Sequence, residues 1–314
     1  MLFKEDIVVV FQTKESLLKV EHVVGVGERF GRTRVFIDKD ITPEQNNKVI
    51  ENVRGILETV SSKHDVTFKC IGKEMTLFNH VGATVSGVLP NNKPFIGTLG
   101  CFAFKISQNK TEKKAVCAIV SKHVAMLASE KSPLVLGKCN QTKDIHGTLL
   151  KTLDRHMYDI AAIEIKEADR YHFCPKFTND QGKELATCSL YDHETSVARG
   201  QYLVYIWGAK SKPGLGEIDA DHFFVDGCEH IILIQNRSKP ETTFCEAGDS
   251  GAIVLAKRRN GDCAMGMVIG AYEAAGGKTD KQRYGALLLK PGLEQLGEEN
   301  KCKLLLCTDS MSSE

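Results

Sequence analysis

The chain has 314 residues and a formal net charge of +1, with 26% charged and 42% hydrophobic residues. It is long enough to bury one large core or two smaller ones. The near-neutral charge balance argues against a nucleic-acid partner, which would need a basic surface. No apolar run reaches the length that spans a bilayer, so no membrane partner is expected either.

The 11 cysteines, an odd number, bear on the cellular compartment. Residues 1–6 carry acids where a secretory signal would carry basic residues ahead of a long apolar stretch. An odd number of cysteines behind such a start suits a reducing compartment. We therefore expect a cytoplasmic protein with reduced thiols. Cys101 and Cys117 could instead face one another as a candidate disulfide pair, but reduced thiols are the preferred interpretation for them too.

Residues 1–81 are predicted to form a small α+β domain. Apolar runs predict strands at 7–11, 23–27, 33–37 and 65–71, of which the second and third form a hairpin. Before the last strand, Thr42 and Gln45 match a capping box, and Pro43 suits the first position of a helix. The residues that follow recur at helical spacing and predict one buried face, made of Val49, Val53, Ile56, Leu57 and Val60.

Residues 82–314 have a different pattern, in which short alternating strands are separated by Gly, Pro, Asn and Asp turns. This pattern is typical of packed β-barrels. We expect one barrel at about 82–170 and a second at about 195–300, joined by a charged, turn-rich connection at 167–194. The polar tail 308–314 is expected to be disordered.

A candidate nucleophile, Ser250, lies between Asp249 and Gly251 at the start of an apolar strand. Serine is a weak nucleophile, so it needs a neighbouring imidazole as base and an acid that fixes the imidazole tautomer. His123 follows an apolar strand and a small polar turn, and Asp159 stands at the head of an alternating strand. These two residues are the candidate base and acid.

Asp154 is the alternative for the acid. The alternation of apolar residues begins directly after Asp159, whereas Asp154 and His156 lie upstream of it, where side chains are expected to face solvent. Asp159 is therefore the preferred acid.

The order His–Asp–Ser, with the longer gap second, resembles that of the chymotrypsin- and trypsin-like serine peptidases. The resemblance covers roughly residues 85–300 and includes further strand-like runs at 97–104, 203–208, 265–271 and 284–289. It is closest to the non-secreted type with an N-terminal extension. It implies a mainly β fold, a chymotrypsin-like double β-barrel preceded by the small α+β domain. It also implies hydrolysis of peptide bonds in proteins or peptides through an acyl-enzyme.

The same resemblance assigns the roles of the candidate site residues. Ser250 attacks the scissile carbonyl, His123 takes the serine proton and returns it to the leaving amine, and Asp159 holds the imidazole. The backbone N–H groups of Gly248 and Ser250 form the oxyanion hole, where a negative charge develops on the substrate oxygen.

In the peptidases that the chain resembles, the residue six positions before the nucleophile lies at the base of the primary pocket, and counting back from Ser250 gives Phe244. The walls of this pocket would come from Ile269, Gly270 and Ala271. The spacing around the preceding cysteine is one residue longer than in secreted relatives, so Thr243 is the alternative base.

Two other functions stay open. One is a catalytically inactive interaction module, because Ala252 replaces the second glycine usual after the serine and Asp249 has no evident partner in the sequence. The other is a protease that its N-terminal domain gates until a regulatory partner binds.

No cofactor and no metal are expected. His172, Cys174, Cys188 and His193 have zinc-like spacing only loosely, and a structural zinc site would need all four to converge. A solvated connection that carries ordinary thiols is the preferred interpretation of this stretch.

Overall fold

The computed structural model describes most of the chain. The described residues are 13–29, 32–60, 66–71, 75–77, 85–88, 94–107, 115–126, 135–136, 147–154, 158–165, 177–185, 188–192, 203–208, 211, 213–225, 228–237, 243–258, 261–272 and 282–307. The strand expected at 7–11 and the tail 308–314 lie outside these ranges.

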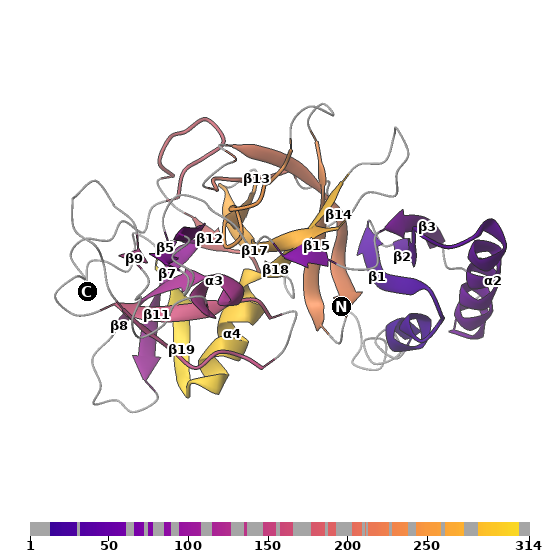
Figure 1. The fold of residues 1–314 in the computed structure, drawn as a ribbon, viewed down its shortest axis with the longest axis horizontal. Helices are drawn as coiled ribbons and strands as arrows, with labels where there is room; N and C mark the ends of the chain where they lie inside the picture. The colour runs from indigo at the N-terminus through magenta and orange to yellow at the C-terminus, as the bar shows by residue number, and fades with distance from the viewer. Residues whose placement is uncertain are drawn as a thin grey trace.

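The N-terminal unit contains a helical turn at 13–18 and four longer elements: β1 (Val23–Arg29), β2 (Arg32–Asp38), α2 (Pro43–Val60) and β3 (Val66–Ile71). Strands β1 and β2 form the expected antiparallel hairpin, and β3 runs parallel to β2 after the crossover through α2. This unit lies at one end of the molecule (Figure 1).

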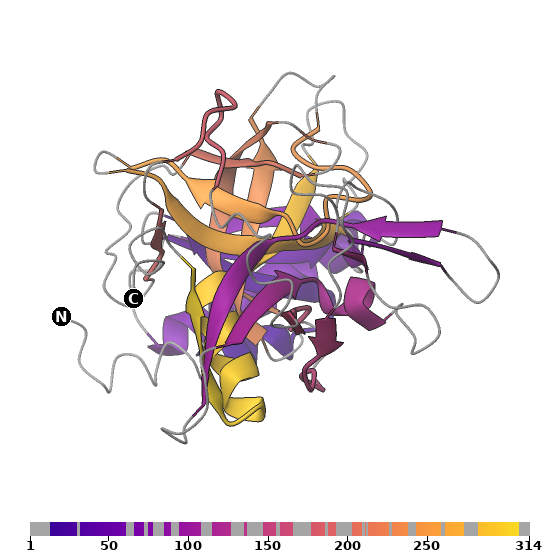
Figure 2. The ribbon, with the colours of Figure 1, turned by 90° about the vertical axis from the view of Figure 1, so that its left-hand side faces the viewer.

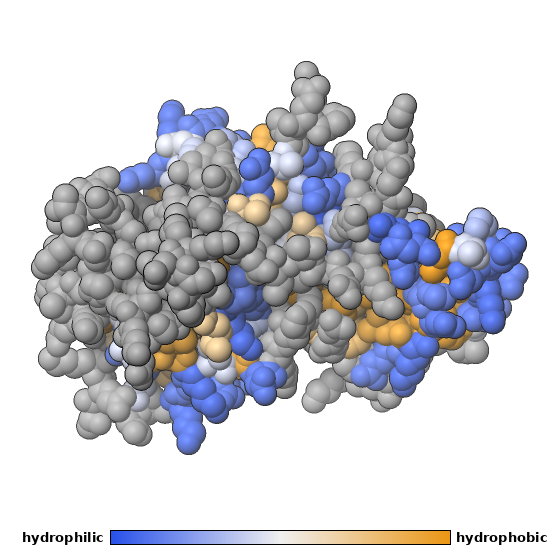
Figure 3. Space-filling view, viewed as in Figure 1, coloured by the Kyte–Doolittle hydropathy of each residue, from blue (hydrophilic) through white to orange (hydrophobic). Residues whose placement is uncertain are grey.

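The start of α2 is the predicted capping box. The Gln45 N–H donates to Thr42 Oγ1 over 3.2 Å, and the Thr42 N–H donates to Gln45 Oε1 over 2.9 Å. The predicted apolar face is also present, since Val49, Val53 and Leu57 are buried against the hairpin. Hydrophilic side chains cover the outer side of this end of the molecule (Figure 3).

The second barrel is a closed ring of six strands. Its order is β13-β16-β17-β18-β15-β14, and the pairing of β13 with β14 closes the ring. The strands are β13 (Leu203–Ile206), β14 (Gly214–Val225), β15 (Cys228–Asn236), β16 (Ile253–Ala256), β17 (Cys263–Tyr272) and β18 (Arg283–Leu288). Two short strands, β12 (Ser189–Leu190) and β4 (Met75–Leu77), are added to β17.

The first barrel region consists of two sheets in the described part of the chain. The larger has the order β10-β11-β8-β7-β19 and the smaller the order β6-β5-β9. The strands are β5 (Val85–Val88), β6 (Pro94–Gly97), β7 (Cys101–Ser107), β8 (Ala115–Val120), β9 (Val135–Leu136), β10 (Gly147–Leu149), β11 (Ala161–Ile165) and β19 (Cys302–Leu306). A short helix, α3 (Lys122–Met126), follows β8. The fold is therefore mainly β, as predicted, with one closed six-strand barrel and additional sheets, and this arrangement is consistent with the expected chymotrypsin-like double barrel.

The C-terminal end returns to the first barrel. Helix α4 (Leu289–Glu299) buries Leu293 and Leu296 in the main core, and β19 then pairs antiparallel with β7. The view in Figure 2 shows β19 beside β7. The sequence pattern does not predict β19.

The sheet of the N-terminal unit continues directly into the second barrel. Strand β1 pairs antiparallel with the C-terminal half of β14, with Val26 opposite Phe224. The crossing is close: a Cβ on Gly25 would lie 2.1 Å from the Phe223 ring, and one on Gly27 would lie 2.8 Å from Ala220 Cβ. Both glycines are therefore required by the approach of β1 to β14.

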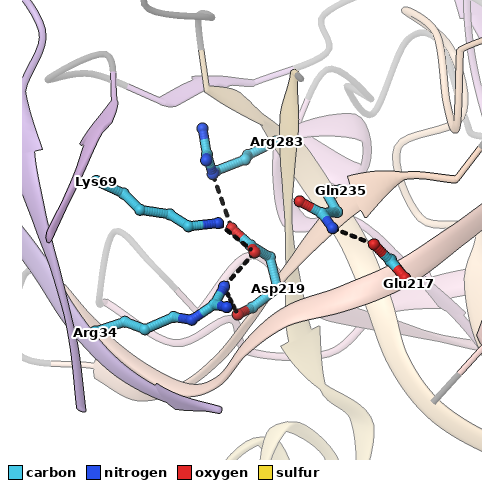
Figure 4. Close-up of polar contacts among 6 residues, drawn as sticks. All are labelled: Arg34, Lys69, Glu217, Asp219, Gln235 and Arg283. Atoms are coloured by element: carbon cyan, nitrogen blue, oxygen red, sulfur yellow. Dashed lines mark hydrogen bonds and ion pairs between the residues drawn. The ribbon is translucent and has the colours of Figure 1, made fainter. Parts of the chain in front are cut away.

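A buried ion cluster joins the same two bodies (Figure 4). The Asp219 side chain on β14 is fully buried. Its Oδ1 accepts a bond from Lys69 Nζ over 2.8 Å and another from Arg34, and its Oδ2 accepts one from Arg283 Nε over 2.8 Å. Arg34 and Lys69 belong to the N-terminal unit, whereas Arg283 lies on β18.

Charge pairing dominates the ionisation of Asp219. Burial by itself would raise its pKa, but the ion pairs and hydrogen bonds with Lys69 and Arg283 outweigh burial and lower the pKa to about 2. Burial is the largest influence on the pKa of Lys69 and lowers it. Asp219 acts in the opposite direction, and the neighbouring guanidinium groups of Arg34 and Arg283 lower this pKa further. The carboxylate is therefore ionised and holds the cluster together.

We expect Asp219→Asn to lower the free energy of unfolding by about 3–5 kcal/mol, because the buried Arg283 and the partly buried Arg34 and Lys69 lose their counter-charge. Urea unfolding at neutral pH measures this loss. The matched control is Asp180→Asn, which removes a partly exposed pair with Lys257 and should cost less than about 1 kcal/mol. Equal urea midpoints for wild type and Asp219→Asn would contradict the role of the cluster.

The pH dependence of stability follows from the direction in which folding shifts the pKa of Asp219. Because folding lowers the Asp219 pKa to about 2, its contribution is fully present above about pH 4 and is lost as the pH falls towards 2. Wild type should therefore lose this increment of stability on acidification, and Asp219→Asn should not.

Candidate active site

His123 and Asp159 are in direct contact. Strands β8 and β11 pair with Ala161 opposite Val120, which brings the end of β8 next to the start of β11. The His123 backbone N–H donates to Asp159 Oδ1 over 2.8 Å, and His123 Nδ1 lies 2.6 Å from Asp159 Oδ2. Asp159 is 3% exposed. A carboxylate at Nδ1 keeps the proton on that nitrogen, so a neutral ring presents Nε2 as a base.

Ser250 lies in the turn that precedes β16, and its side chain is buried. The Ser121 hydroxyl donates to Ser250 Oγ over 3.4 Å, a long contact from a residue just ahead of His123. The structure thus joins His123 to Asp159 directly and joins Ser250 to the turn that carries His123. The exposed Asp154, the alternative acid, lies in the loop before β11.

The turn around Ser250 depends on two glycines with positive φ, 111° at Gly248 and 94° at Gly251. Thr98, on the first barrel, holds this turn at two points. Its hydroxyl donates to the Gly248 carbonyl over 2.8 Å, and its N–H donates to the Ser250 carbonyl over 3.1 Å. Thr98 is 4% exposed, so both bonds are shielded from water.

The N–H groups of Gly248 and Ser250 are the expected oxyanion donors. Within the described ranges, neither of these two N–H groups has an acceptor, although both residues are buried. Buried backbone donors are nearly always paired in proteins. Two unsatisfied donors beside a serine are therefore suited to bind a developing oxyanion.

Asp249, whose partner the sequence left open, is fully buried and held by backbone amides. Its carboxylate accepts bonds from the Glu246 N–H over 2.9 Å and from the Ser211 N–H over 3.3 Å. Gly208 permits this approach, because a Cβ there would lie 2.2 Å from Asp249 Oδ1. The bond from Ser211 ties the turn that carries Ser250 to the loop that follows β13.

The predicted pocket residues are distributed over two parts of the core. Phe244 is fully buried, its ring centroid 5.4 Å from that of Tyr284, and a Cβ on Gly216 would lie 2.8 Å from the Phe244 ring. Ala271 belongs to the same cluster, whereas Ile269 packs into the other main cluster.

Gly270 and Thr243, the other two residues of the predicted substrate pocket, have different surroundings. Gly270 on β17 is paired on both sides, with Gly285 of β18 and with Leu77 of β4. Thr243, the alternative base, is exposed, and its hydroxyl donates to Glu246 Oε1 over 3.1 Å. The assignment of the pocket stays a prediction.

The buried thiols are poorly suited to chemistry at neutral pH. Cys101 and Cys117 are free thiols, and they are not opposite one another in the β7–β8 ladder, where Cys101 faces Ile119 and Cys117 faces Ala103. Burial raises the pKa of Cys117 to about 12 and also raises that of Cys101. A thiol is unreactive while it is protonated.

A metal site was not expected from the sequence. Among the described residues, no group of three or more His, Cys, Asp or Glu side chains is arranged to hold a metal ion. His172, Cys174 and His193 lie outside the described residues.

None of the helices that the structure describes is long and apolar enough to cross a membrane.

No protein-family model matches the chain, and no curated protein matches it. Among solved structures, a glutamic-acid-specific serine protease described as using a histidine triad in substrate binding aligns at 12% identity. The TM-score is 0.42, and the alignment covers 67% of this chain and 98% of that one.

The Thr98 hydroxyl generates a prediction about the reactivity of Ser250. We expect Thr98→Val to slow labelling of Ser250 by a fluorophosphonate about 5- to 10-fold, because the Gly248 peptide loses one buried hydrogen bond. The second-order labelling rate constant measures this effect. Thr98→Ser keeps the hydroxyl and is the matched control. If the valine variant labels as fast as wild type, Thr98 does not position the turn that carries Ser250.

Proposed function

We propose that this protein is a serine endopeptidase that hydrolyses peptide bonds through an acyl-enzyme. The observation that carries the proposal is the pairing of His123 with Asp159 at 2.6 Å, together with two buried backbone donors beside Ser250 that have no acceptor among the described residues. A base with a fixed tautomer and an oxyanion site are the two requirements of acyl transfer to serine.

The proposed reaction has two stages. His123 Nε2 removes the Ser250 proton as Oγ attacks the scissile carbonyl, and the N–H groups of Gly248 and Ser250 bind the resulting oxyanion. His123 then gives its proton to the leaving amine, and the acyl-enzyme forms. In the second stage His123 activates a water molecule, which releases the acid product and restores Ser250.

The rival function, a catalytically inactive interaction module, has lost part of its support. It rested on Ala252 and on the missing partner of Asp249, and Asp249 has backbone partners. Ala252 is buried, and its N–H donates to the Asp249 carbonyl over 2.8 Å, which is compatible with an ordered turn.

The cytoplasmic location also stays a proposal, which rests on the cysteine count.

The proposal predicts the behaviour of the three residues under substitution. We expect Ser250→Ala, His123→Ala and Asp159→Ala each to lower peptide hydrolysis by about 10⁴-fold without unfolding the protein. Their combined losses should be far from additive, because the three groups act as a unit. Steady-state hydrolysis and circular dichroism provide the two measurements.

Two controls accompany this experiment. A fluorophosphonate should label wild type and not Ser250→Ala, and Asp154→Ala should retain near-normal turnover because Asp154 is exposed. No labelling of the wild-type serine would support the inactive module. Normal turnover of Asp159→Ala would show that another residue is the acid.

A second prediction concerns specificity. We expect cleavage after small or medium uncharged residues and poor cleavage after Lys or Arg. Phe244 supplies no carboxylate, and an unpaired ammonium or guanidinium is costly to desolvate. A peptide-library digest read by mass spectrometry measures the preference.

The variant Thr243→Asp tests the alternative pocket base. If Phe244 is the base, a carboxylate at the exposed position 243 should leave the preference unchanged. Dominant cleavage after basic residues by wild type, or acquired by Thr243→Asp, would overturn the assignment of Phe244.

A further inference from the structure

Strand β4 pairs with the part of the β17 edge that extends beyond the pairing of β17 with β16. Strand β16 pairs with β17 from Cys263 to Met267. The remaining segment, Gly270–Tyr272, has β18 on one side and β4 on the other. In the β4 ladder, Leu77 lies opposite Gly270 and Met75 opposite Tyr272.

This edge starts close to the candidate nucleophile. The Gly251 N–H donates to the Val268 carbonyl over 2.9 Å, and the Val268 N–H donates to the Ala252 carbonyl over 2.9 Å. The turn that carries Ser250 is therefore bonded to β17 just before Gly270. An extended peptide whose scissile carbonyl lies at Ser250 Oγ can pair its main chain with this edge, as strand addition does at other sheet edges.

The N-terminal unit keeps β4 close to that edge. Only residues 72–74 separate β4 from β3, and β3 carries Lys69, which is paired with the buried Asp219 of the barrel. A short connection between two anchored segments gives an effective concentration in the millimolar range. A free peptide substrate must compete with β4 at that concentration.

We propose that β4 is an intramolecular competitor of the substrate, bound antiparallel to Gly270–Tyr272, and that peptides engage the site only when β4 leaves this edge. The inference rests on the proposed peptidase function and adds a mode of regulation to it. A competitor of this kind raises KM for extended substrates and leaves kcat unchanged, because saturating substrate displaces it.

The kinetic test uses full-length protein with proline in β4. The N–H groups of neighbouring strand residues point to opposite sides, so either Thr76→Pro or Leu77→Pro removes a ladder donor. We expect one of the two to lower KM for an extended peptide substrate about 5- to 10-fold at constant kcat. Thr76→Ala keeps the backbone donor and should behave as wild type. An unchanged KM in both proline variants would overturn the proposal.

A second test needs no substitution and so cannot fail through misfolding. Wild-type protein is labelled at Ser250 either with an extended peptide phosphonate or with a small fluorophosphonate, and amide hydrogen exchange is followed at residues 75–77. The peptide phosphonate should remove exchange protection there, whereas the small probe should leave it in place. Protection that persists under the peptide phosphonate would overturn the proposal.

The two tests separate this inference from the proposed function. If the small probe does not label Ser250 and no variant hydrolyses peptides, the peptidase function itself fails. If the small probe labels Ser250 while KM and exchange protection stay unchanged, only the competition by β4 fails.

Discussion

Strand β14 is the element on which the arrangement of the whole molecule depends. Its first half pairs with β13 and closes the second barrel, and its second half pairs with β1 of the N-terminal unit. Between these pairings lies Asp219, a fully buried carboxylate bonded to cations from both bodies. A buried ion pair adds little net stability compared with apolar packing, but it is costly to break. One strand therefore fixes the N-terminal unit against the barrel, and with it the position of β4.

The candidate active site is assembled from both barrels. The first contributes the pair His123–Asp159, and the second contributes Ser250 and the turn around it. Thr98 links them, because one residue of the first barrel bonds the carbonyls on either side of Asp249. Preorganised donors contribute most when they need not reorient during the reaction. The Thr98 contacts between the barrels thus help to hold the candidate site together.

The buried carboxylate of Asp249 shows how this chain orders the turn that carries Ser250. Two backbone N–H groups, from Ser211 and Glu246, bond to it, and Gly208 leaves room for the approach. These partners are already part of the folded chain. The turn that carries Ser250 is therefore ordered in the intact protein.

Local sequence patterns determined much of this protein. The capping box of α2 and the hairpin of β1 and β2 follow from residues close together in the chain, and His123 and Asp159, expected as a base and its acid, are in contact. Such features depend on short-range hydrogen bonding and on the periodicity of apolar residues. The mainly β class was predictable for the same reason.

Only the tertiary structure decided the contacts between distant segments. The sequence shows Asp219 as an acid in an alternating strand, and nothing near it identifies Arg34, Lys69 or Arg283 as its partners. Likewise β19 pairs with β7 and β4 with β17 across long separations. Strand edges bond through the backbone, which is alike in every residue, so side-chain patterns show that a strand exists but not which edge it joins.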